Sequence, residues 1–263
     1  MKCNPANPRE SGTVDVWQEI FPVRFSAIDR SDRITLDAIF QFFQEAAISH
    51  AENLGVGKDD FEKTGQAWIL SRMTVLVKKR PKYGETITVR SWPCGGEKLF
   101  AIRNYDIHDK DDILAVSARS AWLIMDIEKR RPLRPQQTID KLPLNEGLHA
   151  LSAQDAGAAA LAERDNLQKA AERKALYTDI DYNGHVNNVR YIQWIEDALD
   201  PQLLEKADKI RFDINYLNEI LAGEVTDIML APLEDTDCPG AFAFEGRKQE
   251  TGQAAFRAEL RLW

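Results

Sequence analysis

Two stretches of the chain carry hydrophobic residues at the spacing of a helix with one buried face. The first lies between positions 36 and 54, and its apolar positions are Leu36, Ile39, Phe40, Phe43, Ala46, Ala47, Ala51 and Leu54. The second has Val186, Val189, Ile192, Ile195 and Leu199 at the same spacing. This repeat every three or four residues predicts two amphipathic helices. Gly55 and Pro201 are expected to end them, since neither residue continues a helix well.

Strand-like segments follow each predicted helix with no further helix between them. After the first helix, segments rich in β-branched and aromatic residues lie at 71–80, 85–92, 99–108 and 114–126. After the second, similar segments lie at 209–217, 224–231, 240–248 and 254–263. Turn-forming residues separate them, as they do between antiparallel strands. A helix followed by consecutive strands, in both halves, predicts the α+β fold class.

The two halves also resemble each other residue by residue. "IDRSDRI" at 28–34 matches "IDYNGHV" at 180–186 with an offset of 152, and residues 72–85 match 211–224 with an offset of 139. Two matching blocks in the same order indicate a duplication. Two such units could join edge to edge into one continuous sheet, which would pair two strand edges that are otherwise exposed.

The repeat divides the chain into four parts. Residues 1–13 are expected to form a flexible tail, 14–130 the N-terminal unit, 131–173 a linker and 174–263 the C-terminal unit. The linker contains prolines and then an Ala-rich, charged stretch with a weak hydrophobic stripe, which predicts a surface crossing with a short solvated helix. The alternative interpretation of this stretch is a helical lid over a pocket.

Composition narrows the class of protein. Of the 263 residues, 44% are hydrophobic, which is enough for a substantial core. The net charge of -8 disfavours nucleic acid as the main partner, because that binding needs Lys and Arg against phosphates. Three cysteines, an odd number, favour a reducing compartment. No apolar run reaches the roughly 18 residues of a membrane span, and the first residues lack a secretory signal. We therefore expect a cytoplasmic protein without stable membrane association.

Differences between the two copies point to a candidate site. Asp29 and Asp181 match, whereas the other matched pairs differ in chemistry: Ser31 and Asn183, Arg33 and His185, Arg80 and Glu219. His185 precedes a helix, whose unpaired N–H groups and dipole can bind an oxyanion and disfavour an imidazolium. Asn183 can orient water or a carbonyl, and Glu219 can act as a general base. The cluster predicts a hydrolytic site without a covalent nucleophile. The competing interpretation is structural, because Asp and Asn commonly form turns and helix caps.

The same residues carry a family resemblance. "DIDYNGHVNNVRYIQWIEDAL" at 179–199, followed by "INYLNEILAGE" at 214–224, resembles the acyl-acyl carrier protein thioesterases, and segments 21–55 and 68–92 resemble the first half of that family. The resemblance covers about 14–128 and 174–230. It implies a tandem (double) hotdog fold, in which each unit is a long helix wrapped by an antiparallel sheet. It also implies hydrolysis of acyl-acyl carrier protein to release free fatty acid, which ends chain elongation.

Carried over by motif, the family's catalytic residues fall on Asp181, Asn183, His185 and Glu219. Plant members commonly have a Cys after the Glu, but this chain has Ile220, which removes a Cys-His mechanism. The resemblance implies neither a metal nor a cofactor. It places the acyl chain in the N-terminal half, where the candidate wall residues are Phe40, Phe43, Ala47, Trp68 and Met73. These residues could instead be ordinary core residues.

The implied partner is a strongly acidic acyl carrier protein with a phosphopantetheine-linked acyl chain. Two basic runs are candidates for its docking surface, "KKRPK" at 78–82 and "KRRPLR" at 129–134. The sequence leaves both a monomer and a homodimer open. An acyl-coenzyme A hotdog thioesterase and a noncatalytic acyl-binding protein remain alternatives. A hotdog dehydratase is less favoured, because the surroundings of Glu45 do not resemble that family.

Overall fold

The computed structural model describes residues 15–143, 145, 147–155 and 160–263, so the expected tail at 1–13 lies outside the described residues. Helix α1 (Leu36–Asn53) begins where the Thr35 side chain accepts a hydrogen bond from the Ala38 N–H, and the chain leaves it at Gly55 with φ +70°. Helix α4 (Asn188–Glu196) begins after Asn187, whose side chain caps the Val189 N–H. Both predicted helices are confirmed.

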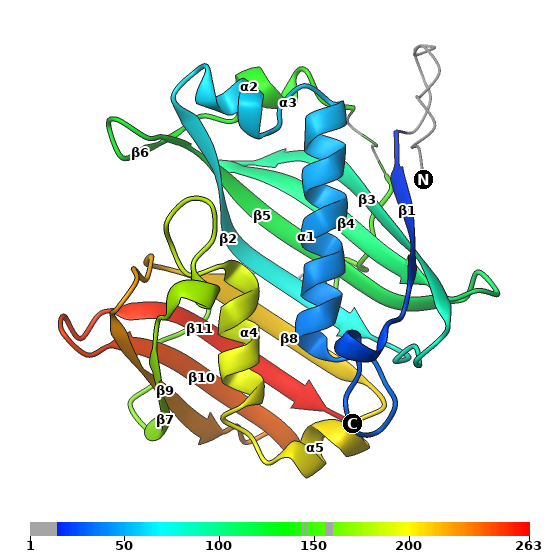
Figure 1. Cartoon of the computed structure of the whole chain (residues 1–263), viewed down its shortest axis with the longest axis vertical. Helices are drawn as coiled ribbons and strands as arrows, with labels where there is room; N and C mark the ends of the chain where they lie inside the picture. The colour runs from blue at the N-terminus through cyan, green and yellow to red at the C-terminus, as the bar shows by residue number, and fades with distance from the viewer. Residues whose placement is uncertain (1–14, 144, 146, 156–159) are drawn as a thin grey trace.

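The strands form one antiparallel sheet that runs through both halves (Figure 1). In the first half the spatial order is β1 (Trp17–Pro22), β3 (Thr86–Glu97), β4 (Phe100–His108), β5 (Leu114–Asp126) and β2 (Gln66–Val77). In the second half it continues with β8 (Ile210–Tyr216), β11 (Ala254–Leu262), β10 (Gly240–Lys248), β9 (Val225–Pro232) and β7 (Gln168–Lys174). Read outward from the centre, the two halves have the same order of connections, which confirms the duplication and the continuous sheet.

The halves meet at strands β2 and β8, which pair antiparallel from Arg72–Asn215 to Val77–Ile210. Thr74 lies opposite Asp213, which is its own counterpart at the offset of 139. The Thr74 hydroxyl donates a hydrogen bond of 2.7 Å to Asp213 Oδ1. A local two-fold axis therefore passes between these two side chains and relates the two copies.

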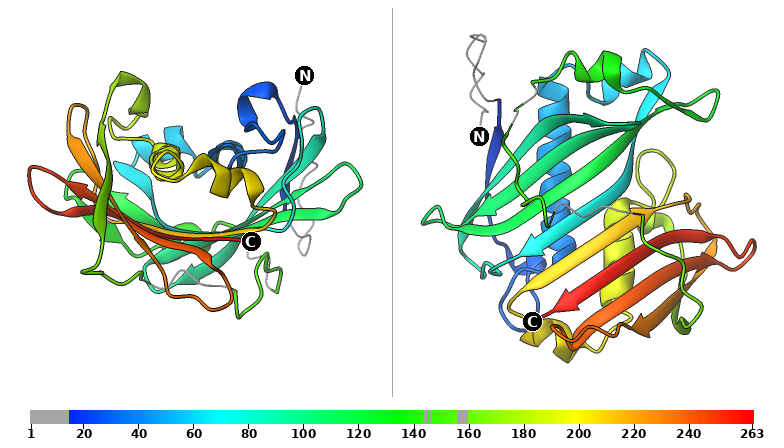
Figure 2. Two further views of the ribbon diagram at one scale, coloured as in Figure 1. Left: turned by 90° about the horizontal axis from the view of Figure 1, so that it is seen from below. Right: turned by 180° about the vertical axis from the view of Figure 1, so that it is seen from behind.

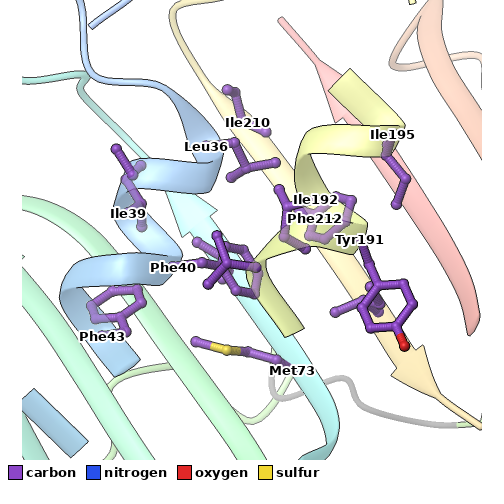
Figure 3. Packing of buried hydrophobic residues seen from close by; sticks show 14 of the residues in the cluster. Leu36, Ile39, Phe40, Phe43, Met73, Tyr191, Ile192, Ile195, Ile210 and Phe212 are labelled. Carbon is purple, nitrogen blue, oxygen red and sulfur yellow. The ribbon is translucent and has the colours of Figure 1, made fainter. Parts of the chain in front are cut away.

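Helices α1 and α4 lie side by side on the concave face of the sheet (Figures 1 and 2). Their apolar faces meet strands β2 and β8, and the Phe40 ring contacts the Phe212 ring edge-on at 5.7 Å between centroids (Figure 3). Phe40, Ile192 and Phe212 belong to one cluster that takes residues from both halves. Burial of each such side chain stabilises the fold by about 2 kcal/mol. The two copies therefore share a single core.

The segment 131–173, expected as a linker, carries more structure than its sequence predicts. It contains strand β6 (Arg131–Leu133), which pairs with β5, the short helix α3 (Gln136–Ile139), and β7. The Ala-rich residues 168–174 have helix-forming composition, but they pair with the open edge of β9, because strand pairing overrides a weak helix preference. Residues 160–174 contain no helix, so this described part forms no helical lid. The proposed unit boundaries themselves stay a prediction.

Three other elements, β1, α2 (Lys58–Glu62) and α5 (Pro201–Lys206), were not predicted from the sequence. Strand β1 at the outer edge of the first half was not predicted, although its alternating burial is that of a half-exposed strand. Pro201 was expected only to end the second helix, yet it also occupies the first turn of α5, where a missing N–H has no cost. Helix α5 lies near the start of α1 (Figure 1).

Candidate active site

The loop before α4 is held by the carboxylate of Asp181. Asp181 Oδ1 accepts hydrogen bonds from the backbone N–H groups of Asn183 at 2.8 Å and His185 at 3.4 Å. The Asp181 N–H donates to the His185 carbonyl at 2.8 Å, which closes the loop. Gly184, with φ +82°, takes the left-handed conformation that this tight turn requires. The predicted residue Asp181 thus acts in this structure as the anchor that presents His185.

The corresponding loop of the first half has the same geometry. Asp29 Oδ1 accepts hydrogen bonds from the N–H groups of Ser31 at 2.8 Å and Arg33 at 3.4 Å, and the Asp29 N–H donates to the Arg33 carbonyl at 2.9 Å. Each loop follows a short 3-10 helix, η1 (Phe25–Ala27) or η2 (Tyr177–Asp179). The backbone frame is therefore common to both copies, and the chemistry depends on which side chains stand on it.

Glu219 lies in the turn after β8 and faces His185. The Val186 N–H donates to the Ile220 carbonyl at 2.9 Å, and His185 forms a β-bridge with Leu221, so the two segments are held in register. His185 Nε2 lies 3.1 Å from Glu219 Oε2. The side chains are 33% and 37% exposed, which leaves the pair open to water and to a ligand. The structure thus brings together the predicted histidine and the predicted carboxylate.

A third side chain, which the sequence analysis did not assign to the site, contacts the same carboxylate. Arg130, in the turn between β5 and β6, donates a hydrogen bond of 2.7 Å to Glu219 Oε1. This hydrogen bond is the largest cause of the lowered pKa of Glu219; partial burial opposes it, and the charges of His185 and Lys248 add to it. Glu219 is therefore held as a carboxylate.

Asn183 stands at the exposed apex of the loop. Its side chain has no hydrogen-bond partner within the part of the chain that the structure describes, although its backbone N–H is bound by Asp181. The amide is therefore available to a ligand, but its predicted catalytic role is untested. Asn187 serves as the cap of α4, as the structural interpretation of this motif anticipates.

The counterpart of this site in the first half is closed by an arginine. Arg80, the residue that matches Glu219, is only 5% exposed and donates hydrogen bonds of 2.8 Å to the carbonyls of Ile34 and Leu204. Its guanidinium also pairs with the Asp29 carboxylate. Leu204 belongs to α5, so Arg80 fastens the first copy of the loop to that helix. The two copies thus keep one backbone frame, which carries a buried arginine in the first half and an accessible His–Glu pair in the second.

The predicted acyl-chain residues do not all lie together. Phe40, Phe43, Ala47 and Met73 are buried in the shared core beneath α1, with exposures from 1% to 7%. Trp68 lies in a separate small cluster, where its ring stacks on Phe61 of α2 (Lys58–Glu62) at 5.0 Å between centroids. Trp68 Nε1 also donates to the Val56 carbonyl at 2.9 Å. Their assignment to an acyl pocket stays a prediction.

Three further features concern metal binding, membrane spans and cavities within the described residues. No group of three His, Cys, Asp or Glu side chains is arranged to hold a metal ion. No helix there has both the length and the apolar character to cross a membrane. A small cavity is lined by Leu161, Leu167 and Arg257, and His185 is not among its lining residues.

Comparison with known proteins covers both halves. The acyl-ACP thioesterase N-terminal domain matches residues 14–141, and the acyl-ACP thioesterase C-terminal domain matches residues 162–261. A chloroplastic acyl-[acyl-carrier-protein] hydrolase of Cuphea viscosissima is 26% identical over 222 residues, which are 78% of this chain and 52% of that protein. The chain thus spans about half the length of the curated relatives it matches.

Solved structures support the fold. An acyl-ACP thioesterase from Bacteroides thetaiotaomicron has 24% identity and a TM-score of 0.75, covering 94% of this chain and 98% of its own. The 12:0-ACP thioesterase from Umbellularia californica has 20% identity and a TM-score of 0.80, covering 94% and 97%. At these identities the likeness shows the fold, and the expected tandem hotdog architecture is confirmed. Because the two domain matches together include most of its residues, the chain belongs to the acyl-ACP thioesterase family.

Proposed function

We propose that this protein hydrolyses acyl-[acyl carrier protein] to free fatty acid and the carrier thiol, and so ends fatty acid elongation. The observation that carries the proposal is the contact of 3.1 Å between His185 Nε2 and Glu219 Oε2, made only in the half whose loop precedes α4. Family membership supports the substrate class. No covalent nucleophile is needed, because the pair lies open to water.

In the proposed mechanism, Glu219 accepts a proton from a water molecule as that water attacks the thioester carbonyl carbon. Each carboxylate oxygen has two lone pairs, so contacts to His185 and Arg130 leave acceptor positions for the water. The N–H groups of Val186 and Val189 already donate within the protein, so the exposed amide of Asn183 is the donor that stabilises the oxyanion. The carbon–sulfur bond then breaks, and the proton on Glu219 passes to the departing thiolate.

The test is a product-resolved assay with acyl carrier protein substrates of several chain lengths. Removing a general base or its partner typically lowers the rate about 100- to 10,000-fold, which we expect for Glu219→Gln and His185→Ala. Asn183→Ala is expected to lower kcat with little change in KM, because its amide would act on the oxyanion. Near-normal rates in all three variants would overturn the site. If the enzyme hydrolysed acyl-coenzyme A faster than acyl carrier protein with the same acyl chain, acyl-coenzyme A would be the better candidate substrate.

The structure distinguishes the two basic runs proposed for docking. In 78–82, Arg80 is buried against Asp29 and Lys79 pairs with Asp109 at 2.6 Å, so both cations have structural partners. In 129–134, the cationic residues are exposed and adjoin the Arg130 contact with Glu219, although Lys129 also pairs with Asp126 at 3.5 Å. We therefore propose that Lys129, Arg131 and Arg134 receive the acidic carrier. Replacing them by Gln should raise KM for acyl carrier protein more than for acyl-coenzyme A, and this difference should fade at high salt.

We further propose that the acyl chain lies against α1 in the N-terminal half. The support is the apolar lining offered by Phe40, Phe43, Ala47 and Met73, with Trp68 at one end. Ala47→Phe places a bulky ring on the buried face of α1, so the product profile of this variant should move to shorter chains. An unchanged profile in a folded variant would place the chain elsewhere.

A cytoplasmic location is also proposed. Cys94 and Cys238 are unpaired in the part of the chain that the structure describes, which suits a reducing compartment. Cell fractionation with an antibody to the protein would test this proposal.

A further inference from the structure

We propose that Arg130, supplied by the N-terminal half, is a positioning residue that orients the Glu219 carboxylate of the C-terminal half toward His185. The active site would then be complete only when both halves are present. The proposal deepens the proposed function, since it rests on Glu219 as the base. It concerns a residue 89 positions away from Glu219 in sequence.

The contacts divide the two carboxylate oxygens between two partners. Arg130 binds Oε1 at 2.7 Å and His185 Nε2 lies 3.1 Å from Oε2. A carboxylate held at both oxygens by different groups has a fixed plane as well as a fixed position, and hydrogen bonds to charged groups are the stronger kind. Without Arg130, the Glu219 side chain could rotate into solvent, since it is 37% exposed.

The turn between β5 and β6 holds Arg130 where its side chain can contact Glu219. Between Asp126 and Arg131, which pair as the last residues of β5 and the first of β6, the chain turns in four residues. Asp126 Oδ1 accepts the Lys129 N–H at 2.9 Å and stabilises the turn. Arg130 then adopts φ +50°, a left-handed conformation in which glycine is favoured. The chain holds an arginine at this strained position, where its side chain meets Glu219.

Other charged groups near Glu219 act less directly on its carboxylate. Lys248 of β10 donates to the Glu219 backbone carbonyl at 3.2 Å, and its charge is balanced by Glu224 at 2.8 Å. On the loop side, His185 faces the carboxylate, and Asp181 is occupied by backbone N–H groups. Arg130 is thus the cation that contacts the carboxylate itself and the main cause of its lowered pKa.

This arrangement predicts a change in the pH dependence of the rate. A base must be ionised, so activity falls as the pH drops through the pKa of Glu219. Removal of a group that lowers this pKa moves the acidic limb to higher pH. A role limited to folding would lower the rate at every pH and leave the limb in place.

The experiment measures kcat against pH for wild type, Arg130→Gln and Arg130→Lys with one acyl carrier protein substrate. Arg130→Gln should move the acidic limb to higher pH and lower kcat about threefold on that limb, while Arg130→Lys should restore much of the wild-type profile. High salt should shift the wild-type limb in the same direction and have little further effect on Arg130→Gln. An acidic limb of Arg130→Gln that coincides with wild type would overturn the proposal.

Arg164→Gln is the matched control, because Arg164 also pairs with a glutamate, Glu259, at 2.8 Å and lies on the outer face of the sheet. Its profile should be that of wild type. If Arg130→Gln is poorly folded, Arg130→Gly removes the same guanidinium while favouring the turn, and the same shift is expected.

Glu219→Gln distinguishes the proposed function from the proposed role of Arg130. Normal activity in that variant would defeat the proposed function, whereas loss of activity with an unmoved Arg130→Gln limb would defeat only the role of Arg130.

Discussion

At the residue scale, the matched positions 80 and 219 show how one frame came to serve two purposes. The arginine at 80 is buried and donates hydrogen bonds to the Asp29 carboxylate and to three backbone carbonyls. The glutamate at 219 meets a histidine and remains accessible. Two differences between the halves account for this contrast. Arg80 of the first half is replaced by Glu219, and Arg33 is replaced by His185, so a buried Arg–Asp pair in one half corresponds to an accessible His–Glu pair in the other.

Replacing each of the two loop aspartates by alanine should therefore have different effects on stability and on activity. Asp29→Ala leaves the buried Arg80 without its carboxylate, which should lower the free energy of unfolding by about 3 kcal/mol while kcat stays near wild type. Asp181→Ala removes two backbone hydrogen bonds at a more exposed loop and should lower stability by about 1 kcal/mol, with a large loss of kcat. Denaturant unfolding and steady-state kinetics measure the two quantities.

Arg80→Met provides the control for Asp29→Ala, because it removes the buried cation as well. The double variant should recover part of the stability that Asp29→Ala loses. Equal activity losses in Asp29→Ala and Asp181→Ala would contradict the division of roles between the two halves.

The repeat comparison selected His185 and Glu219, which the fold brings into contact, but it did not select Arg130. His185 and Glu219 could be identified because they differ from Arg33 and Arg80 in otherwise matching blocks. Arg130 could not be identified in this way, because it lies in neither matched block. Its contact with Glu219 joins two turns that are far apart in sequence and meet only in the folded sheet. In the sequence, Arg130 stands out only as one cation of the basic run at 129–134.

At the scale of elements, the end of α4 meets the beginning of α1 through two partly buried carboxyl groups. Glu196 Oε1 accepts the Leu36 N–H at 3.0 Å, and Asp37 accepts a hydrogen bond of 2.7 Å from Gln193. Burial raises the pKa of Glu196 to about 8, and the neighbouring charge of Asp37 adds to the effect. The matching residue of α1, at the offset of 152, is the neutral Gln44.

This contact predicts a pH-dependent stability. The folded protein keeps a proton on Glu196 that the unfolded chain releases above its ordinary pKa, so the free energy of unfolding falls as pH rises from about 4.5 to about 8. Glu196→Gln should be more stable than wild type near pH 8, by an amount on the order of 2 kcal/mol. Near pH 4 the two proteins should unfold alike. An unchanged pH slope in denaturant unfolding of the variant would contradict this explanation.

The sequence predicted the central elements better than those at the edges. Strands β2 to β5 and β8 to β11 carry long apolar or alternating patterns, because they face the shared core, and each was anticipated. Strands β1 and β7 border the sheet. Strand β1 has only six residues and ends at Pro22, and the composition of β7 matches a helix as readily as a strand. Their structure depends on the neighbouring strand edge, which no local pattern records.

At the scale of the whole molecule, the halves depend on each other through the β2–β8 pairing and the common core. A chain interrupted between positions 155 and 160 should give two fragments that recover activity when expressed together. Each fragment alone should aggregate or remain unfolded, since it would expose one unpaired central strand. Purification of the pair and assay of acyl carrier protein hydrolysis test this expectation. A folded, cooperatively unfolding monomer from either fragment alone would contradict it.

The pair on the local two-fold axis, Thr74 and Asp213, has a consequence for the history of the chain. In a dimer of identical single units, the residue on this axis would face its own copy, and two aspartates there would repel each other. Once there were two copies, the two positions could mutate separately and form a donor with an acceptor. Covalent linkage then keeps the two different copies together, so neither position has to be complementary to itself.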